Sequence, residues 1–447
     1  MAQLSKAYEP KEHEAKIYSL WEGSGYFNPD NLPGGRNEPF TIMMPPPNVT
    51  GVLHLGHAGG IALEDLMIRF ERMRGKKTLW LPGTDHAAVA TQTKVEKKLI
   101  KESGQSRHDL GREEFLKLVR AFATESHATI TGQIRKMGAS CDWSREAYTL
   151  DEPRSLAVRT VFKKMFDDGL IYRGTRVVNW DVAFQTTLAD DEVFTKDVVA
   201  KLYTFKYDKN FPFAISTTRP ETKFGDTAVA VHPSDERYKE YIGRVFEVNY
   251  CGTPLSIKVV ADIATDPEFG TGVVGVTPAH SKIDEEIGKR HELPSIQVID
   301  TNGKMTERAG KLVAGLTTLE AREKAVEYLR QNGLLLEEKD VPQALPISQR
   351  GETIVEELPM LQWFVDVNKK INGRGKSLKE LSIEAVRSGQ IEIIPERFQK
   401  IYFQWMENLR DWCISRQIWF GHQIPVWYRP AVILSGTKNL DPEMYVG

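Results

Sequence analysis

The feature that most constrains the fold is a short stretch in which the backbone is first fixed and then freed. Residues 40–44 (FTIMM) are apolar, and the three prolines at 45–47 end this run, because proline cannot donate a hydrogen bond to a sheet. The glycine-containing run NVTGVLHLGHAGG follows. Residues 53–74 then carry apolar side chains at helical spacing, namely Leu63, Leu66, Met67 and Phe70. The pattern predicts a buried strand, a tight turn and a helix.

A second apolar run, KTLWLPGTDHA at 77–87, follows the predicted helix. A strand, a helix and a further strand form a βαβ unit, which implies a parallel sheet with a right-handed crossover. Ligands of such sheets bind at the carboxyl ends of the strands. We therefore expect an α/β fold with a doubly wound parallel sheet, and a site directly after the prolines.

The pattern changes near residue 200. Short β-rich runs separated by Gly, Pro and Asp extend to about residue 345: LYTFKY, FAISTT, TAVAVH, VFEVNY, LSIKVVA, VVGVT and IQVID. Residues 356–427 return to longer helical patterns with several tryptophans. This order indicates a β-rich insertion in a doubly wound domain, with a first part at 1–195, the insertion at 196–345 and a second part at 346–447.

Composition narrows the class of protein but not its partner. The 447 residues carry a formal net charge of -2, which by itself does not favour a polyanionic partner. The sequence has no 18-residue apolar run and no apolar stretch at its start, so we expect a cytoplasmic protein with no membrane segment. Cys141, Cys251 and Cys413 are far apart, so that neither a disulfide framework nor a zinc site is indicated and buried thiols are expected.

The most informative polar residues are His54 and His57, at the start of the predicted helix. Free amide groups and the positive end of the helix dipole favour a phosphate there, and two imidazoles three residues apart can both donate to its oxygens. Gly51 and Gly56 allow close approach of the backbone to a ligand. The alternatives are a chance pair or a metal pair, but no third metal ligand is nearby and the common glycine-rich phosphate motifs are absent.

At this point a family resemblance becomes close. PPPNVTGVLHLGHA resembles the HIGH signature of class I aminoacyl-tRNA synthetases, in the form found in the valine-specific members, and LPGTDHAAVATQ resembles their second block. Isoleucine- and leucine-specific relatives are expected to show a GWD-type block instead. Further similar stretches run along essentially the whole chain: MGASCDWSREAYTLDE, VVNWDVAFQTTLADDEV, STTRPETKFGDTAVAVHP, GTGVVGVTPAH and DWCISRQIWFGHQIPVWY.

The resemblance implies a Rossmann-like catalytic domain that binds ATP and an amino acid. Its catalytic residues would be His54 and His57, which hold the ATP phosphates, with Gly56 and Asn48 completing the ATP site. Asp85 would bind the ammonium group of the amino acid, although an Asp in this place can also be a helix N-cap. The amino-acid pocket would be lined by Pro46, Asn48, Trp363 and Trp412. Core packing is the alternative role for each tryptophan.

The resemblance also implies that the β-rich insertion is an editing domain. Threonine is isosteric with valine, and an apolar pocket rejects an added hydroxyl only weakly, so a second site must hydrolyse the wrong product. The editing residues would be Thr217, Thr218, Arg219, Thr222 and Asp284. The family pattern PAHDxxD reads PAHSKID here, with Ser281 in place of the first carboxylate. Taken alone, TTRPET could be only a polar turn.

The family's second signature, the KMSKS loop, does not occur, and the only late lysine is Lys438. The anticodon-binding helical domain is also missing. We therefore expect an incomplete portion of an enzyme roughly twice as long, truncated before that loop.

The expected function is a valine–tRNA ligase, which activates valine with ATP and substrate-bound Mg²⁺, transfers it to tRNA(Val) and hydrolyses Thr-tRNA(Val). A monomer without a zinc site is expected. The alternatives are a stand-alone editing hydrolase, an isoleucine-specific relative and an RNA-binding module without chemistry.

Overall fold

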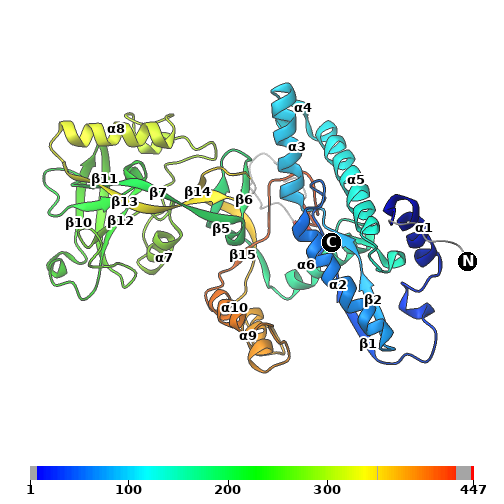
Figure 1. Ribbon diagram of the computed structural model, residues 1–447. Helices are drawn as coiled ribbons and strands as arrows, with labels where there is room; N and C mark the ends of the chain where they lie inside the picture. The colour runs from blue at the N-terminus through cyan, green and yellow to red at the C-terminus, as the bar shows by residue number, and fades with distance from the viewer. Residues whose placement is uncertain (1–7, 350, 429–443) are drawn as a thin grey trace, which may run out of the picture. The chain divides into compact units, whose positions relative to one another are not determined.

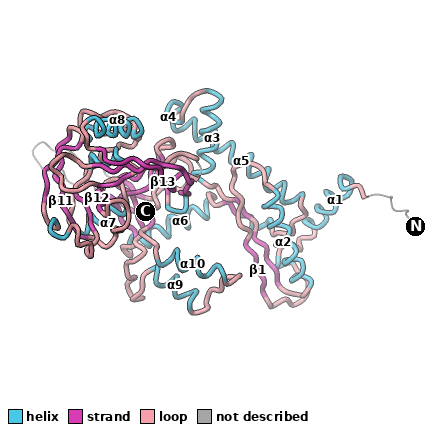
Figure 2. Tube along the Cα trace, turned by 60° about the vertical axis from the view of Figure 1, so that its left-hand side comes forward, coloured by secondary structure: helices cyan, strands magenta, loops and turns pink. Residues whose placement is uncertain are grey.

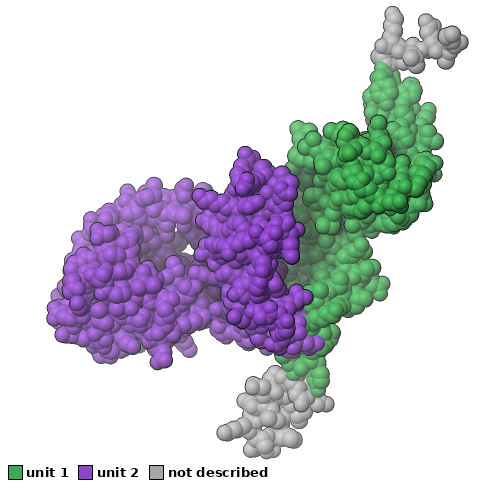
Figure 3. Space-filling view, turned by 90° about the horizontal axis from the view of Figure 1, so that it is seen from below, with its two compact units in different colours: residues 1–164, 418–447 green, residues 165–417 purple. Residues whose placement is uncertain are grey.

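The computed structural model (Figure 1) describes residues 8–349, 351–428 and 444–447. Figure 2 distinguishes its helices from its strands. The chain divides into two compact units, coloured separately in Figure 3. Unit 1 comprises Met1–Lys164 and Ile418–Gly447, and unit 2 comprises Met165–Gln417.

Unit 1 contains the predicted βαβ arrangement. Strand β1 (Pro39–Met43) pairs in parallel with β2 (Lys77–Leu81), and helix α2 (Leu55–Met73) connects them. The register runs from Pro39 opposite Lys77 to Met43 opposite Leu81. The prediction of strand, turn, helix and parallel strand is confirmed, because the prolines end β1 and α2 begins within two residues of its predicted start.

The buried side of α2 is not the one that carries the apolar residues singled out above. Ile61 and Ile68 are buried, and they pack in a cluster with Trp80 of β2. The residues whose spacing predicts the helix each expose more than half of their surface in the described part of the chain, namely Leu63, Leu66, Met67 and Phe70. The helix therefore has two apolar sides, and only one of them faces the core of unit 1.

The remaining elements of unit 1 are mostly helical. The longest helix, α5 (Arg112–Lys136), contributes Phe115, Val119 and Ile130 to the buried clusters. The other helices and strands are α1 (Pro10–Gly23), β3 (Gly83–Thr84), α3 (Ala88–Ser103), α4 (Arg107–Leu110), β4 (Ala147–Tyr148), β16 (Val426–Tyr428), β17 (Met444–Val446) and α6 (Glu152–Asp167), whose last turn belongs to unit 2.

Unit 2 contains a four-stranded sheet in the order β15-β14-β5-β6. Its central strands, β5 (Ile171–Asp181) and β14 (Val355–Val365), pair antiparallel over eleven positions. The expectation of helical structure throughout 356–427 is therefore wrong for β14, because this strand is stabilised by a partner far away in the sequence. It is confirmed for α9 (Leu378–Arg387) and α10 (Arg397–Glu407). The edge strands are β6 (Thr186–Leu188) and β15 (Trp412–Cys413).

The rest of unit 2 is the β-rich segment. Two long strands, β7 (Val193–Phe205) and β13 (Leu335–Ser348), pair antiparallel from Val193 opposite Ser348 to Phe205 opposite Leu335. Strand β8 (Ile215–Thr217) extends this pair, and a second sheet has the order β10-β11-β9-β12. Its strands are β9 (Ala228–Val231), β10 (Val245–Tyr250), β11 (Thr253–Ala261) and β12 (Val273–Val276).

Helix α8 (Thr318–Gln331) packs beside β13, and α7 (Lys282–Arg290) packs beside β12 and β5 (Figure 1). The prediction of short strands in this segment is confirmed for six of the seven runs. It is wrong for IQVID, which makes only an isolated bridge between Ile299 and Met305. The expected buried thiols are confirmed, because Cys141, Cys251 and Cys413 are free and buried.

Candidate functional site

His54 and His57 lie together at the start of α2 and form a reciprocal capping box. Nδ1 of His54 accepts hydrogen bonds from the backbone amides of Gly56 (3.1 Å) and His57 (3.4 Å). Nδ1 of His57 accepts one from the amide of His54 at 3.3 Å. The two rings are 3.8 Å apart between centroids and tilted by 33°. Both imidazoles lie on one side of the first turn, as the sequence predicts, and hydrogen bonds to the backbone hold them there.

This arrangement assigns the protons on both rings. A neutral imidazole whose Nδ1 accepts a hydrogen bond carries its proton on Nε2, so each ring has one N–H group directed away from the helix cap. Burial and the neighbouring His54 lower the pKa of His57, which favours its neutral form. Two neutral N–H donors are therefore available beside the positive end of the α2 dipole.

The glycine between the histidines has a specific steric role. A Cβ atom at Gly56 would lie 2.9 Å from Cε1 of the His54 ring, so only glycine allows that ring to cap the helix. The expectation of free backbone amides at this helix start is wrong for Gly56 and His57, because the His54 ring already occupies both. Gly51 has a φ of 139°, which side chains rarely adopt.

Asn48 and Asp85 are brought together beyond the prolines. They form an isolated parallel bridge that continues the β1–β2 pairing. The Asp85 amide donates to the Pro47 carbonyl, and the Val49 amide donates to the Asp85 carbonyl, both at 2.8 Å. Pro46 is exposed and Asn48 is half-buried. The chain thus places Asn48 and Asp85 at the carboxyl ends of the two parallel strands, where ligands of such sheets bind.

The Asp85 carboxylate is oriented by Thr149, a residue that the sequence analysis did not identify. The Thr149 hydroxyl donates to Oδ1 of Asp85 at 2.9 Å and accepts from the His86 amide at 2.9 Å. Its oxygen also lies 2.6 Å from Nδ1 of His86. Since the single hydroxyl proton is used by Asp85, Nδ1 of His86 is the donor. Thr149 lies in the family-like stretch MGASCDWSREAYTLDE, but its contact with Asp85, 64 residues away in the sequence, does not follow from the residues around it.

Oδ1 of Asp85 also accepts a hydrogen bond from the Ala87 amide at 2.8 Å, just before α3 begins. The alternative role of Asp85, as a residue that fixes the start of a helix, is therefore partly realised. The other carboxylate oxygen, Oδ2, makes no hydrogen bond to the described residues, and the side chain is 37% exposed. Asp85 can therefore fix the backbone with one oxygen and bind a cation with the other.

Trp363 and Trp412 lie in unit 2 on the neighbouring strands β14 and β15. Trp412 is opposite Val365, and the Ile414 amide donates to the Trp363 carbonyl, so the two tryptophans are diagonal neighbours. Trp363 is buried and packs edge-on against Phe166, whereas Trp412 is 54% exposed. Trp363 is thus a core residue of unit 2, and Trp412 keeps a surface for a ligand.

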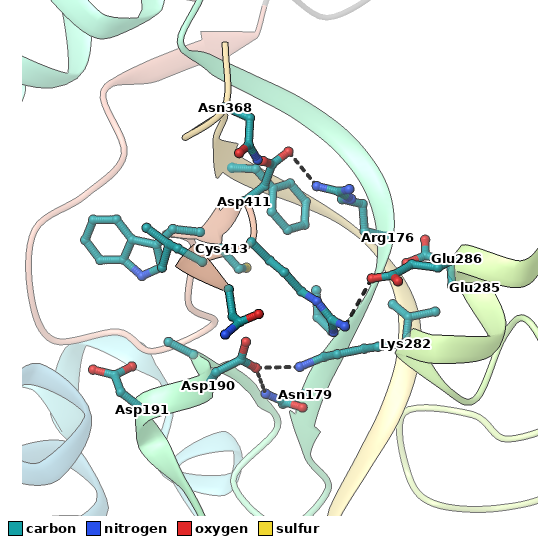
Figure 4. Close-up of a pocket in the computed structure, with 18 of the residues that line it drawn as sticks. Arg176, Asn179, Asp190, Asp191, Lys282, Glu285, Glu286, Asn368, Asp411 and Cys413 are labelled. Atoms are coloured by element: carbon teal, nitrogen blue, oxygen red, sulfur yellow. Dashed lines mark hydrogen bonds and ion pairs between the residues drawn. The ribbon is translucent and has the colours of Figure 1, made fainter. Parts of the chain in front are cut away.

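Trp412 also lines a cleft of about 910 Å³ in unit 2 (Figure 4). The charged side chains of this cleft are paired with one another: Lys282 with Asp190 (2.5 Å), Arg176 with Asp411 (2.5 Å) and Arg410 with Glu286 (3.1 Å). The pairs of Asp411 and Arg410 connect β5 and α7 to the segment that follows α10, and the pair of Lys282 connects α7 to the segment that follows β6. Their mutual neutralisation leaves the cleft without a dominant charge.

The predicted editing loop lies in the β-rich segment and is tightly organised. Thr217 accepts a hydrogen bond from the Arg219 amide, and the Thr222 hydroxyl donates to the Arg219 carbonyl at 2.9 Å. Thr218 accepts from the side chain of Gln343 at 3.1 Å. The Arg219 guanidinium pairs with Glu356 at 2.6 Å and with Glu221 at 3.0 Å. Arg219 therefore shapes the loop through ion pairs.

Glu221 is fully buried and is held by two arginines, because Arg322 binds both of its carboxylate oxygens at 2.8 Å. Burial raises the pKa of Glu221, but Arg322 and Arg219 outweigh this effect and bring the pKa below its usual value. The buried charge is thus fully paired, as such groups must be.

Asp284 and Ser281 lie at the start of α7. Ser281, the residue that departs from the family pattern, caps this helix by accepting a hydrogen bond from the Asp284 amide at 3.2 Å. Oδ2 of Asp284 accepts one from the Thr277 amide at 2.8 Å. Burial raises the pKa of Asp284. Ser281 therefore preserves the helix start that presents Asp284, although it supplies no second carboxylate.

His280, which precedes Ser281, is a structural residue that the sequence analysis did not identify. Its Nε2 accepts hydrogen bonds from the Val298 and Ile299 amides at 2.9 and 3.3 Å, and its Nδ1 donates to the Glu357 carbonyl at 3.1 Å. Burial lowers the pKa of His280 to about 3. The neutral ring therefore ties three chain segments together.

No cluster of three or more His, Cys, Asp or Glu side chains among the described residues could hold a metal ion. None of the described helices combines the length and apolar character needed to cross a membrane. Lys438 lies outside the described residues.

The chain matches one protein family over most of its length. The family model described as tRNA synthetases class I (I, L, M and V) matches residues 16–437. The chain therefore belongs to this family of class I tRNA synthetases, which confirms the resemblance seen in the sequence and the mixed α/β class of the fold.

Within that family, the chain is similar to valine–tRNA ligases. It is 47% identical over 431 residues to the enzyme of Thermotoga maritima, covering 96% of this chain and 48% of the relative. The enzyme of Protochlamydia amoebophila is 48% identical over 432 residues, covering 96% and 44% respectively. The enzyme of Carboxydothermus hydrogenoformans is 48% identical over 428 residues, covering 95% and 47%. The chain thus spans about half the length of the curated relatives it matches.

Among solved structures, the chain is similar to the ternary complex of Agrobacterium radiobacter K84 agnB2 LeuRS with tRNA and LeuAMS. The sequence identity is 18% and the TM-score is 0.35, over 78% of this chain and 49% of that chain.

Proposed function

We propose that this chain carries the valine-activating half-site and the editing segment of a valine–tRNA ligase. The observation that carries the proposal is the pair of neutral Nε2–H donors of His54 and His57, held by a mutual cap at the start of α2. In the same unit, Asn48 and Asp85 meet at the carboxyl ends of β1 and β2. The similarity to valine–tRNA ligases supports valine as the amino acid.

In the proposed reaction, a carboxylate oxygen of valine attacks the α-phosphorus of ATP. A bond forms between that oxygen and phosphorus, the bond to the bridging oxygen of the β-phosphate breaks, and pyrophosphate leaves. His54 and His57 stabilise the charge on the phosphate oxygens through their Nε2–H groups. Gly56 and Asn48 complete the ATP site. Mg²⁺ accompanies ATP as part of the substrate.

The free Oδ2 of Asp85 binds the valine ammonium, as a charge-assisted hydrogen bond. By similarity to the family, the proposed amino-acid-binding residues are Pro46 and Asn48 of unit 1 and Trp363 and Trp412 of unit 2; of the two tryptophans, only Trp412 is exposed, and Trp363 would support it from the core. A hydroxyl of the terminal ribose of tRNA(Val) then attacks the valyl carbonyl of the adenylate, an ester bond forms, the bond to the phosphate oxygen breaks and AMP leaves, without a covalent enzyme intermediate. Positioning and charge stabilisation supply the catalysis in this scheme.

We further propose that the two catalytic parts, residues 1–195 and 346–447, form a Rossmann-like doubly wound domain in a monomeric, cytoplasmic enzyme. Residues 196–345 would be its editing domain. Editing is required because an apolar pocket that accepts valine excludes threonine only weakly. The proposed editing residues are Thr217, Thr218, Arg219, Thr222 and Asp284, with Asp284 binding the ammonium of the misplaced threonine.

A second candidate function is a stand-alone editing hydrolase. The observation that favours it is that the proposed editing residues all belong to unit 2, whose hydrogen bonds and ion pairs complete the loop and the start of α7. In this alternative, the catalytic half is only a scaffold.

One pair of assays tests both candidates. Valine-dependent exchange of labelled pyrophosphate into ATP by this chain, lost in His54→Asn, supports the ligase and contradicts the pure hydrolase. Hydrolysis of Thr-tRNA(Val) without exchange contradicts the ligase for this chain and supports the hydrolase. Exchange driven by isoleucine in preference to valine would refute the assignment of valine. Loss of neither activity in His54→Asn and Asp284→Asn would indicate an RNA-binding module.

A further inference from the structure

A buried polar cluster lies behind Asp284. Its centre is Lys223, which follows the predicted editing loop and is only 5% exposed. The Lys223 ammonium donates to Oδ1 of Asp226 (3.1 Å), to the Gly275 carbonyl (2.8 Å) and to the Thr277 hydroxyl (2.8 Å). Its three protons therefore have three acceptors. A buried lysine is costly unless it is paired, so this position is closely defined.

Asp226 is the counter-charge of Lys223 and is equally enclosed. Its Oδ1 also accepts a hydrogen bond from the Thr277 hydroxyl at 2.5 Å, and its Oδ2 accepts one from Tyr207. A Cβ atom at Gly275 would lie 2.5 Å from Oδ2 of Asp226 and 2.9 Å from the Tyr207 hydroxyl. Only glycine therefore fits at this point of β12, and the cluster requires it.

Thr277 connects this cluster to Asp284. Its hydroxyl bonds to Lys223 and Asp226, while its amide donates to Oδ2 of Asp284 at 2.8 Å. Among the described residues, the Ser281 hydroxyl is the other group that hydrogen-bonds to the Asp284 carboxylate. Oδ2 is thus fixed from behind by the Thr277 amide, and Oδ1 accepts no backbone amide of the described residues.

We propose that Lys223, Asp226 and Thr277 are positioning residues that fix the Asp284 carboxylate, place a buried positive charge behind it and leave its Oδ1 for the ammonium group of an aminoacyl ligand. This inference rests on the proposed editing function and deepens it. Lys223, the residue directly after the predicted editing loop TTRPET, supplies this buried positive charge.

The electrostatics explain why the lysine is needed. Burial raises the pKa of Asp284, and a protonated acid is a poor partner for an ammonium group. The titratable groups that act on Asp284 from the surrounding elements are Lys223, which lowers its pKa, and Asp226, which raises it; Tyr207 lies in the same cluster. The hydrogen bonds from Thr277 and Ser281 add to the effect of Lys223. Removing the charge of Lys223 should therefore raise the pKa of Asp284, and neutralising Asp226 should lower it.

A titration of Asp284, followed by the ¹³C NMR signal of its carboxyl group without any ligand, tests the cluster itself. Lys223→Met, which keeps the side-chain length, is expected to raise the pKa of Asp284. Asp226→Asn, which keeps the hydrogen-bonding shape and retains Lys223, is expected to lower it. Lys209→Met removes an exposed lysine of the same segment and is expected to leave it unchanged. Equal pKa values in the first two variants, or shifts in the same direction, would overturn the inference.

A binding experiment then separates this inference from the proposed function. The probe is L-threonine joined through an amide bond to the terminal ribose of adenosine, and its control is the same molecule without the amino group. At a pH well below the pKa of Asp284, a rise of one unit in this pKa lowers the ionised fraction about tenfold, so the probe should bind Lys223→Met about tenfold more weakly than the wild type for each unit of the rise. The control should bind both proteins equally.

The outcomes remain distinguishable. Opposite pKa shifts with no binding of the probe to the wild type would support the cluster and refute the editing function. Binding of the probe to the wild type with no pKa shift in the variants would support the editing function and refute the role of Lys223. Equal loss of probe and control in Lys223→Met would mean that the lysine is only structural.

Discussion

His54 and His57 each accept a backbone amide of the other's turn through Nδ1, so their two Nε2–H groups are oriented before any ligand binds. The cap replaces hydroxyl and carboxylate side chains, which usually occupy this position of a helix. The same atoms thus stabilise the fold and prepare the phosphate site, and a suitable substitution should separate the two roles.

We expect His54→Asn to separate them. Asparagine is a good helix cap but does not carry the Nε2–H donor, so the stability of unit 1 should be retained while the affinity for ATP falls about tenfold. His54→Ala should lose the affinity and also about 1 kcal/mol of stability. Equilibrium binding of ATP and urea unfolding measure the two effects. An unchanged ATP affinity in His54→Asn would contradict the phosphate role.

Thr149 should matter for the amino group of the amino acid. Thr149→Val removes the hydroxyl that orients Asp85, and we expect the affinity for L-valine to fall about tenfold, the equivalent of one hydrogen bond to a charged group. Thr149→Ser keeps the hydroxyl and is the matched control. Calorimetry with L-valine and with isovalerate, which has no amino group, checks the reason. Equal losses for both ligands would show that Thr149 acts on the fold alone.

His280 should make unit 2 sensitive to acid. Its pKa is about 3 in the folded protein and 6.5 in the unfolded chain, so the unfolded state binds more protons below pH 6.5. Stability should be complete above pH 6.5 and fall by about 1.4 kcal/mol per pH unit as the pH decreases towards 3. Urea unfolding at several pH values measures this slope. His280→Gln, which can accept and donate hydrogen bonds without titrating here, should reduce it; an unchanged slope would contradict the assignment.

Glu221 should be the most sensitive member of the arginine network. Glu221→Gln removes the carboxylate that Arg322 binds, whereas Arg219 keeps its pair with Glu356, and we expect a loss of about 3 kcal/mol in the free energy of unfolding. Glu236→Gln breaks an exposed pair with Lys239 in the same segment and should leave the unfolding midpoint unchanged. Similar midpoints for both variants would show that the buried network is not stabilising.

The sequence predicts local structure well where a few residues restrict the backbone. Prolines 45–47 end β1, and the following glycines allow the turn into α2, so this arrangement follows from steric rules. The side of α2 that faces the core could not be predicted from the sequence. Leu66 and Ile68 are both apolar, and their spacing alone does not show that Ile68 is buried and Leu66 exposed. Strand β14 was missed because its stabilising partner, β5, lies about 180 residues earlier.

The candidate site shows the same division. The predicted residues His54, Gly56 and Asp85 stand out because each lies in a short motif. Thr149 and Lys223 lie in longer family-like stretches but do not stand out there, since their roles depend on contacts across long stretches of the chain, such as Lys223 with Gly275. Polar clusters of this kind arise from tertiary packing, which single-sequence patterns do not record.

The long antiparallel pair of β7 and β13 also bears on the history of the gene. Val193 and Ser348 are register partners, so the β-rich segment leaves the rest of unit 2 and returns to it at points only about 5 Å apart. A segment with adjoining ends can be spliced into a host chain, or removed and replaced by a two-residue turn, with little change in loop entropy. The β7–β13 pair would therefore allow the β-rich segment to be inserted or lost as one piece, while β5 and β14 keep their own pairing.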